Sequence, residues 1–342
     1  MRLVILFGGR SAEHDVSCVT AASVLAAANR DRYDVVPVGI DHQNRWVMAE
    51  AAAGALTAVG PVVAPADVLT PGTVVFPVLH GPLGEDGAVQ GLLELAGVPY
   101  VGTGVLGSAL CMDKAKAKEV LALHGLPQVR YHARRDVELD EDEGALEAIA
   151  GELGLPLFVK PANLGSSVAV SKVADAEELA TAVKLALAYD EWVVFEEAVR
   201  GREIECGLLG YPRLRASVPG EVRPSHEFYD YEDKYEDGAA ELLVPAPLPA
   251  EVAAEVRRLA VAAGRALRVD GMARVDFFFD EADRGLLVNE VNTIPGFTAI
   301  SMYPKLWQAS GLTYGGLIDE LVATAFARHR NRADRVGRVD RA

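Results

Sequence analysis

The stretch ARVDFFFDEADRGLLVNEVN, residues 273–292, decides the fold of the C-terminal half of the chain. Apolar and polar residues alternate on both sides of the turn-like EADRG, which predicts an antiparallel hairpin. A register symmetric about the turn places Asp276 opposite Glu290 and Arg274 opposite Asn292, all on one face. The other face then supplies the core with Val275, Phe277, Phe279, Leu287 and Val291.

The facing carboxylates of Asp276 and Glu290 require a compensating cation. Directly opposed residues on a sheet have Cβ atoms roughly 5 Å apart, so the two charges repel by about 3 kcal/mol at an effective dielectric near 20. Oxygen ligands from two acids and Asn292 suit Mg²⁺, which also keeps water and substrate phosphates in its shell. The alternative is a solvent-facing strand whose acids pair with Arg274.

Composition limits the classes of partner. The 342 residues are 50% hydrophobic and 24% charged, which is typical of a globular protein of two or three domains. A net charge of -16 argues against non-specific binding to nucleic acid or to an anionic membrane, because both would be repelled. Cys18, Cys111 and Cys206 are widely spaced, which indicates buried thiols in a reducing compartment and neither a disulfide framework nor a zinc site.

Two apolar stretches bear on localisation. The run at residues 3–7 is too short for a signal peptide and is followed by glycines, so we expect a cytoplasmic protein. The uncharged residues 95–112 approach the length of a membrane span. Four glycines and Pro99 within that stretch predict a short strand, a turn and the start of a helix instead.

The N-terminal third reads as a parallel α/β domain. A strand at 3–7, a glycine loop, a helix at 16–29 and a strand at 35–40 form a βαβ unit. A buried strand at 73–79 follows and ends in the polar loop HGPLGEDG, residues 80–87. Because α/β domains bind ligands at the carboxyl ends of their strands, we expect this loop to face a site.

The rest of the chain predicts a second α/β unit and a mixed C-terminal region. Asp113 is placed to cap a helix that ends at Gly125. Strands at 155–160 and 168–173 flank the segment PANLGSS. The other expected elements are a charged connection at 134–144, a helix at 176–189, a strand at 191–197, a long functional loop at 210–249, and helices at 250–267 and 314–330.

Two glycine loops suggest phosphate or nucleotide binding. In KPANLGSSV, residues 160–168, backbone N–H groups and hydroxyls could cradle phosphate oxygens beside the charge of Lys160; the alternative is an ordinary hairpin turn. GTGVLG, residues 102–107, matches GxGxxG but lies far from the first βαβ unit, and its nearest downstream acid, Glu119, falls in an expected helix. We interpret GTGVLG as a hinge or domain boundary.

Taken together, these segments resemble one family, the ATP-grasp ligases, and within it the D-alanine–D-alanine ligases. The resemblance runs from about residue 3 to residue 321, and seven motifs occurring in the family's order make chance a poor explanation. The motifs are GGRSAEHDVS (8–17), LHGPLGEDG (79–87), MDK (112–114), FVKPANLGSSV (158–168), EFYDYEDKY (227–235), ARVDF (273–277) and NEVNTIPGFTAISMYP (289–304).

The resemblance implies an α/β protein with a three-domain ATP-grasp fold, in which an N-terminal parallel α/β domain precedes two subdomains whose sheets hold ATP between them. The expected units are an N-terminal substrate domain at 1–105, a central ATP-grasp subdomain at 106–208 and a C-terminal ATP-grasp subdomain at 209–330. Residues 331–342 are expected to be a frayed tail.

The resemblance also implies the ligands of ATP and of two Mg²⁺ ions, with Mn²⁺ as an alternative ion. Asp276 and Glu290 would bind one ion, and Glu290 and Asn292 the other. The residues implied in nucleotide binding are Lys114, Lys160, Gly165, Ser166 and Ser167 for the phosphates, Lys234 for the transferred phosphoryl group, Glu196, Glu197 and Val199 for adenine, and Glu203 for ribose.

The implied reaction joins two D-alanine molecules through an acyl phosphate, for peptidoglycan precursor synthesis. Arg274 and the Gly296 N–H would steady the oxyanion, and Ser301 with Met302 would receive the second carboxylate. The residues implied around the first substrate are Glu13 for its ammonium, Ser166 and Tyr235 bonded to Glu13, and His80 near its carboxylate. Their alternatives are a charge at a helix N-terminus for Glu13, a strand cap for His80 and a surface aromatic for Tyr235.

Several readings of the function remain open at this point. Tyr235 favours a dipeptide over D-alanyl-D-lactate, because lactate-using relatives depart from tyrosine there. The rivals are another ATP-grasp carboxylate–amine ligase, a D-alanine–D-lactate ligase and a catalytically silent nucleotide-binding protein. A dinucleotide-dependent dehydrogenase rests only on GTGVLG. The expected partners are small molecules, neither nucleic acid nor membrane, and a second copy of the chain as a homodimer.

Overall fold

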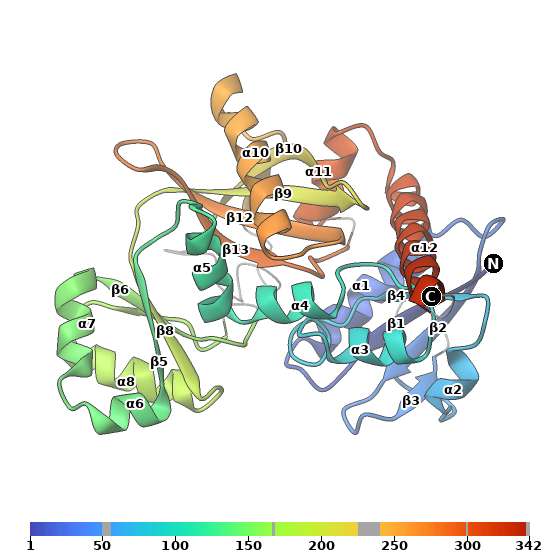
Figure 1. Cartoon of the computed structure of the whole chain (residues 1–342), viewed down its shortest axis with the longest axis horizontal. Coiled ribbons are helices and arrows are strands. Elements are labelled where there is room, and N and C mark those ends of the chain that lie inside the picture. The colour runs from blue at the N-terminus through green and yellow to red at the C-terminus, as the bar shows by residue number, and fades with distance from the viewer. Residues whose placement is uncertain (50–55, 166–167, 225–239, 299, 340–342) are drawn as a thin grey trace.

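Three β-sheets, each covered by helices, build the computed structural model (Figure 1). The structure describes residues 1–49, 56–165, 168–224, 240–298 and 300–339, with the side chains described as far as residue 335. The predicted α/β class is confirmed.

The N-terminal sheet has the order β3-β2-β1-β4, with β1 parallel to both β2 and β4. Residues 3–7 of β1 are fully buried because alternate side chains enter two different cores. A parallel strand covered on both faces reads as a continuous apolar run, which explains LVILF. The elements are β1 (Arg2–Gly8), α1 (His14–Ala27), β2 (Asp34–Ile40), β3 (Trp46–Met48), α2 (Pro65–Val68), β4 (Thr73–Pro77) and α3 (Ala88–Leu95).

The central sheet is antiparallel, with the order β5-β8-β6-β7. Asp113 caps α5 as expected, since its side chain accepts the N–H of Lys116 at 2.9 Å. The charged segment 134–144 becomes the end of β5 and a short helix, α6. The elements are α4 (Val105–Met112), α5 (Lys114–Leu123), β5 (Tyr131–Arg135), α6 (Asp136–Glu141), α7 (Ala145–Leu153), β6 (Leu157–Pro161), β7 (Ser171–Val173), α8 (Ala176–Leu187) and β8 (Trp192–Glu197).

The C-terminal sheet has the order β11-β10-β9-β12-β13. The prediction of one long loop at 210–249 is wrong where the structure describes it, because β10 and β11 lie there. A register shift between Ala216 and Pro219 breaks the alternation that would have revealed β10. The elements are β9 (Arg202–Gly210), β10 (Arg215–Arg223), β11 (Glu241–Leu243), α10 (Ala250–Ala266), β12 (Gly271–Asp280), β13 (Gly285–Asn292), α11 (Met302–Ala309) and α12 (Tyr314–Val339).

The register predicted for the β12–β13 hairpin is confirmed at its functional end, where Arg274 pairs with Asn292 and Asp276 with Glu290. A bulge then adds Asn289, so that Phe277 pairs with Val288 and the turn end is shifted by one residue. Leu287 was therefore placed on the wrong face. The hairpin residues in the core cluster are Ala273, Val275, Phe277, Phe279, Leu286, Val288 and Val291.

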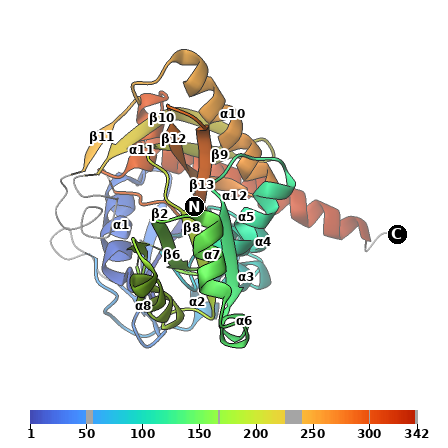
Figure 2. The same cartoon turned by 90° about the vertical axis from the view of Figure 1, so that its left-hand side faces the viewer.

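The segment after residue 330 differs from the expected frayed tail, because α12 continues to Val339 and its C-terminal end extends past the body of the molecule (Figure 2). Arg328 of α12 is buried and donates to the backbone carbonyls of Tyr100, at 2.8 Å, and Gly102. Its guanidinium lies 4.2 Å from the Tyr100 ring centroid. The helix thus ties the GTGVLG segment to the C-terminal sheet.

The apolar stretch at 95–112 forms the end of α3, a bridge of Tyr100 to β4, and α4. None of the helices in the described ranges is long and apolar enough to cross a membrane. Cys18, Cys111 and Cys206 are buried free thiols, as expected.

Candidate active site

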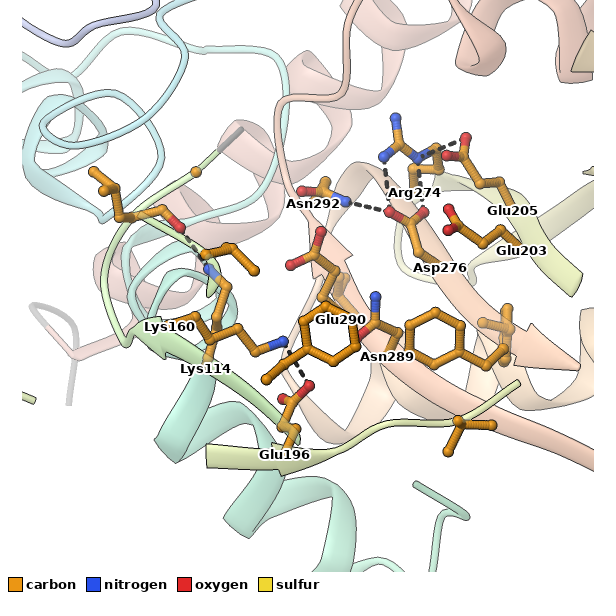
Figure 3. A pocket seen from close by; sticks show the side chains of 18 of the residues that line it. Lys114, Lys160, Glu196, Glu203, Glu205, Arg274, Asp276, Asn289, Glu290 and Asn292 are labelled. Atoms are coloured by element: carbon orange, nitrogen blue, oxygen red, sulfur yellow. Dashed lines mark hydrogen bonds and ion pairs between the residues drawn. The ribbon is translucent and has the colours of Figure 1, made fainter. Parts of the chain in front are cut away.

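A cavity of about 670 Å³ lies between the central sheet and strands β9, β12 and β13. Figure 3 shows Lys114, Lys160 and Glu196 on one wall, facing the polar side chains of the C-terminal sheet on the other. The predicted site residues that line this cavity are Lys114, Lys160, Gly165, Glu196, Glu197, Val199, Glu203, Arg274, Asp276, Glu290 and Asn292.

The wall formed by β12 and β13 carries the predicted carboxylate pair. Both oxygens of Asp276 accept from Arg274, through Nε and Nη2 at 2.7 Å each, and one also accepts from Asn292 Nδ2 at 2.8 Å. Arg274 Nε lies 2.9 Å from Glu205 as well. The alternative to a metal site was a solvent-facing strand whose acids pair with Arg274. Arg274 does pair with Asp276, but both side chains line the cavity. Glu205 was missed because nothing in its own strand marks it.

The same wall is suited to Mg²⁺ by the chemistry of its donors. Asp276 and Glu290 face each other across the hairpin, and Asn292 lies two positions further along on the same face. Carboxylate and amide oxygens are hard ligands of the kind that Mg²⁺ takes together with phosphate oxygens and water. Within the described ranges, no three His, Cys, Asp or Glu side chains are grouped to hold a metal by themselves. Asp276, Glu290 and Asn292 would therefore bind metal together with oxygens supplied by substrate and water.

The opposite wall holds a buried carboxylate between two lysines. Glu196 lies 2.9 Å from Lys118 Nζ and 2.6 Å from Lys160 Nζ. Burial raises the pKa of Glu196, but the two lysines more than offset this and lower it to about 2. Lys118 was missed by the sequence reading. The signal that could have found it is its spacing of four residues from Lys114 on one helix.

The carboxylate of Glu197 accepts hydrogen bonds from two arginines. One of its oxygens accepts from Arg130 Nε at 2.7 Å and the other from the Arg130 N–H at 2.7 Å, while Arg284 also donates to the second oxygen. Burial raises the pKa of Glu197, but these hydrogen bonds lower it further than burial raises it. Its carboxylate therefore anchors two segments, and Val199 follows it in the cavity wall.

The loop after β6 approaches the N-terminal domain. Lys114 Nζ donates to the Leu164 carbonyl at 2.5 Å. A Cβ placed on Gly165 would lie 3.0 Å from a carboxylate oxygen of Glu13, so glycine permits this close approach. Of the predicted residues around this loop, Ser166, Ser167, Lys234 and Tyr235 lie outside the described part of the chain.

The N-terminal domain brings three polar residues towards the cavity. Glu13 is buried, and the loop after β4 passes so close that a Cβ on Gly81 would lie 2.5 Å from its carboxylate. His80 contacts Thr20 Oγ1 at 3.1 Å and the Ile294 carbonyl at 3.0 Å through its two ring nitrogens. Glu85, which the sequence reading did not single out, lines the cavity, and burial raises its pKa to about 8.

The turn after β13 gathers the predicted acceptor-site residues. Ser301 Oγ lies 2.7 Å from Thr298 Oγ1, and a Cβ on Gly296 would lie 3.1 Å from Ser301 Oγ. Met302 begins α11 and is buried against Val222. Gly296 and Ser301 are therefore brought together, although they do not line the cavity itself.

Comparison with known proteins gives consistent matches over nearly the whole chain. Residues 120–323 match the family model "D-ala D-ala ligase C-terminus", and residues 2–67 and 60–103 match "D-ala D-ala ligase N-terminus". A D-alanine–D-alanine ligase of Deinococcus radiodurans is 49% identical over 332 residues, which cover 95% of this chain and 98% of that protein.

Two solved structures are also similar in fold. The D-alanine–D-alanine ligase from Coxiella burnetii has a TM-score of 0.83 at 34% identity, covering 99% of this chain and 98% of that one. A D-Ala:D-Ser ligase from Enterococcus faecalis has a TM-score of 0.81 at 32% identity, covering 95% of this chain and 99% of that one.

Proposed function

The chain belongs to the D-alanine–D-alanine ligase family of the ATP-grasp fold, and from that premise we propose how the residues around its cavity carry out the reaction. It is an ATP-dependent ligase that forms D-alanyl-D-alanine for peptidoglycan synthesis. The observation that carries the assignment of roles is the cavity itself, which sets lysines on one wall against Asp276, Glu290, Asn292 and Arg274 on the other.

The reaction needs two displacements. The carboxylate of the first D-alanine attacks the γ-phosphorus of ATP, which forms an acyl phosphate and releases ADP. The amine of the second D-alanine then attacks the acyl carbon, and the tetrahedral intermediate expels phosphate as the amine loses a proton. Because no protein nucleophile is required, positioning and charge stabilisation supply the catalysis.

The two walls divide this work. Lys114, Lys160 and the loop at 165–167 hold the phosphates, with Lys234 on the transferred group. Asp276 and Glu290 would hold one Mg²⁺, and Glu290 and Asn292 would hold a second; Mn²⁺ could take the place of these ions. When bound, these ions neutralise the charge on the phosphate oxygens. On the central wall, Glu196 acts by fixing Lys160, 2.6 Å away, and the segment with Glu197 and Val199 lines the adenine subsite. Glu203, in β9 of the C-terminal sheet, binds the ribose.

The substrate ends are bound by the turns that converge beyond the cavity. Glu13 accepts the ammonium of the first D-alanine, with Ser166 and Tyr235 orienting the carboxylate of Glu13. Arg274 and the Gly296 N–H stabilise the oxyanion, since Arg274 lines the cavity beside Asp276. Ser301 and the Met302 backbone receive the carboxylate of the second D-alanine.

Three further assignments belong to this proposal. We propose an N-terminal substrate unit and two ATP-grasp subdomains, with the second boundary before β9, because β9 pairs with β12 and a division at residue 208 would cut that strand. A homodimer is proposed from the family resemblance. Cytoplasmic localisation is proposed from the three buried free thiols.

The test is phosphate release from Mg·ATP by the purified protein with a panel of substrates. D-Alanine is expected to give rapid release, and L-alanine, D-lactate and D-serine little. Equal release without any amino acid, or none with D-alanine, would overturn the assignment. Faster release when D-serine is added to D-alanine would instead assign the second subsite to D-serine.

A further inference from the structure

Ile294 is held at both of its backbone polar groups by side chains of the loop that follows β4. Its N–H donates to Glu85 Oε1 at 2.9 Å, and its carbonyl lies 3.0 Å from His80 Nδ1. A carbonyl only accepts, so Nδ1 carries the proton and Nε2 accepts from the Thr20 hydroxyl 3.1 Å away. Burial lowers the pKa of His80, which keeps the ring in this neutral form.

The second oxygen of Glu85 makes a hydrogen bond within its own loop, the one that follows β4. Glu85 Oε2 accepts the N–H of Gly81 at 2.9 Å, next to His80 in the chain. The carboxyl group of Glu85 therefore bridges two backbone N–H groups, that of Gly81 in the N-terminal domain and that of Ile294 after β13, which lies 209 residues beyond Glu85 in the sequence. The Ser11 hydroxyl, which donates to the His80 carbonyl at 2.7 Å, fixes the loop from the side of β1.

The position of Ile294 gives these contacts a consequence for catalysis. Ile294 lies two residues after Asn292 and two residues before Gly296, and its own side chain is buried. We propose that His80 and Glu85 act as positioning residues of the ligase: they clamp the Ile294 peptide and thereby set where the Asn292 oxygen and the Gly296 N–H point. This inference rests on the proposed function, which assigns those two groups to metal and oxyanion.

The clamp differs from the substrate contact that the family resemblance implies for His80. Both ring nitrogens are already used, one by Ile294 and one by Thr20. Displacing a reacting or stabilising group by about 1 Å can reduce the rate by about 10²-fold, so a loosened turn is expected to lower kcat more than it weakens ATP binding.

Glu85→Gln, with Asp86→Asn as a matched control, tests the clamp. Gln presents one acceptor and one NH₂ group, and an NH₂ nitrogen cannot accept where either a carboxylate oxygen or the hydroxyl oxygen of a protonated acid can, so one of the two backbone N–H groups loses its acceptor. Asp86 is an acid in the same loop that also accepts two backbone N–H groups, those of Leu83 at 2.7 Å and Ala88 at 2.9 Å, but it does not contact Ile294. The control therefore separates the effect of destabilising the loop from the effect of losing the hydrogen bond to Ile294.

Two measurements are made on each variant: hydrogen exchange of a fragment containing the Ile294 amide, without substrate, and steady-state kinetics with D-alanine and Mg·ATP. Glu85→Gln is expected to speed the exchange at least about tenfold and to lower kcat by about 10- to 100-fold, with the KM for ATP changed less than about threefold. Asp86→Asn is expected to change each quantity less than about threefold.

Unchanged exchange in Glu85→Gln, or equal losses of kcat in the two variants, would overturn the proposal. A raised KM for ATP with kcat intact would do the same, because Glu85 would then only shape the nucleotide cavity. If the wild-type protein ligates no D-alanine, the proposed function fails, while the exchange data still decide whether the clamp exists.

Discussion

Replacing Lys118 by Met removes one of the two cations that hold the buried carboxylate of Glu196. Lys118 is 2% exposed and lies 2.9 Å from one oxygen of Glu196, while Lys160 lies 2.6 Å from the other. Leaving a buried charge without a partner costs about 3–5 kcal/mol. Because Lys160 remains, we expect a smaller loss, about 2–3 kcal/mol of unfolding free energy, or an apparent Tm lower by roughly 4–10 °C.

The same substitution has a functional consequence. With Lys118 gone, Glu196 draws on Lys160 alone, so the ammonium group that should face phosphate is more fully neutralised. The KM for ATP is therefore expected to rise about tenfold, which corresponds to roughly 1.4 kcal/mol. Differential scanning calorimetry and initial-rate kinetics measure the two effects.

Lys116→Met is the matched control. Lys116 is on the same helix, α5, and also lies 2.9 Å from a carboxylate, that of Glu119, but both side chains are about half exposed. An exposed pair of this kind contributes less than about 1 kcal/mol, so we expect little change in Tm or KM. Equal losses of stability in the two variants would refute the argument, because burial would then make no difference.

Three further predictions concern other parts of the molecule. Glu290→Gln is expected to lower turnover by at least about 10³-fold while the circular dichroism spectrum is retained; near-normal turnover would show that β13 does not carry the metal ligand. Burial raises the pKa of Glu85 to about 8, well above the usual range of a glutamate, so the folded protein binds a proton there that the unfolded chain has released. The free energy of unfolding should therefore fall as pH rises from about 5 to 8, by up to about 1.4 kcal/mol per pH unit. Denaturation measured across this range should show a shallower fall for Glu85→Gln than for the wild type. Parallel profiles would contradict the assignment of this pH dependence to Glu85. Arg328→Met, which loses the bond to the Tyr100 carbonyl, should cost about 2–3 kcal/mol, whereas Arg330→Met, at an exposed position, should cost less than about 0.5 kcal/mol; matched Tm values would count against the role given to α12.

The active-site hairpin could be predicted because its information is local. Strict alternation assigns each side chain to a face, and two alternating runs around a short turn leave few registers. The pairing of Asp276 with Glu290 follows from that alone. The bulge at Asn289 could not be predicted, because a single added residue leaves the composition of the strand unchanged and depends on how the backbone twists against its neighbour.

Contacts between segments that are distant in the sequence could not be predicted from the pattern of residues. Lys118 and Glu196 are 78 positions apart in the printed numbering, and neither has a neighbour that marks it as a buried charge. Glu85 lies within the motif LHGPLGEDG, but its role depends on the hydrogen bond that it accepts from the Ile294 N–H. The sequence alone does not show that these two groups are neighbours. The family resemblance supplied roles for motif residues but not these supporting pairs.

The charges that line the cavity indicate that nucleotide binding requires both the lysine wall and the wall formed by β12 and β13. Its described lining carries seven carboxyl groups and five cationic side chains in a chain of net charge -16; even with Glu85 protonated the acids outnumber the cations, so side chains alone do not attract a polyanionic nucleotide. Glu196 and Glu197 are held by cations or guanidinium groups, and Asp276 by Arg274. We infer that the hairpin wall contributes by binding divalent cations that arrive with the nucleotide. Two such ions would change the net charge of the lining from negative to positive. On this proposal, the lysine wall would orient phosphates whose charge these ions had balanced, so nucleotide binding would need both walls.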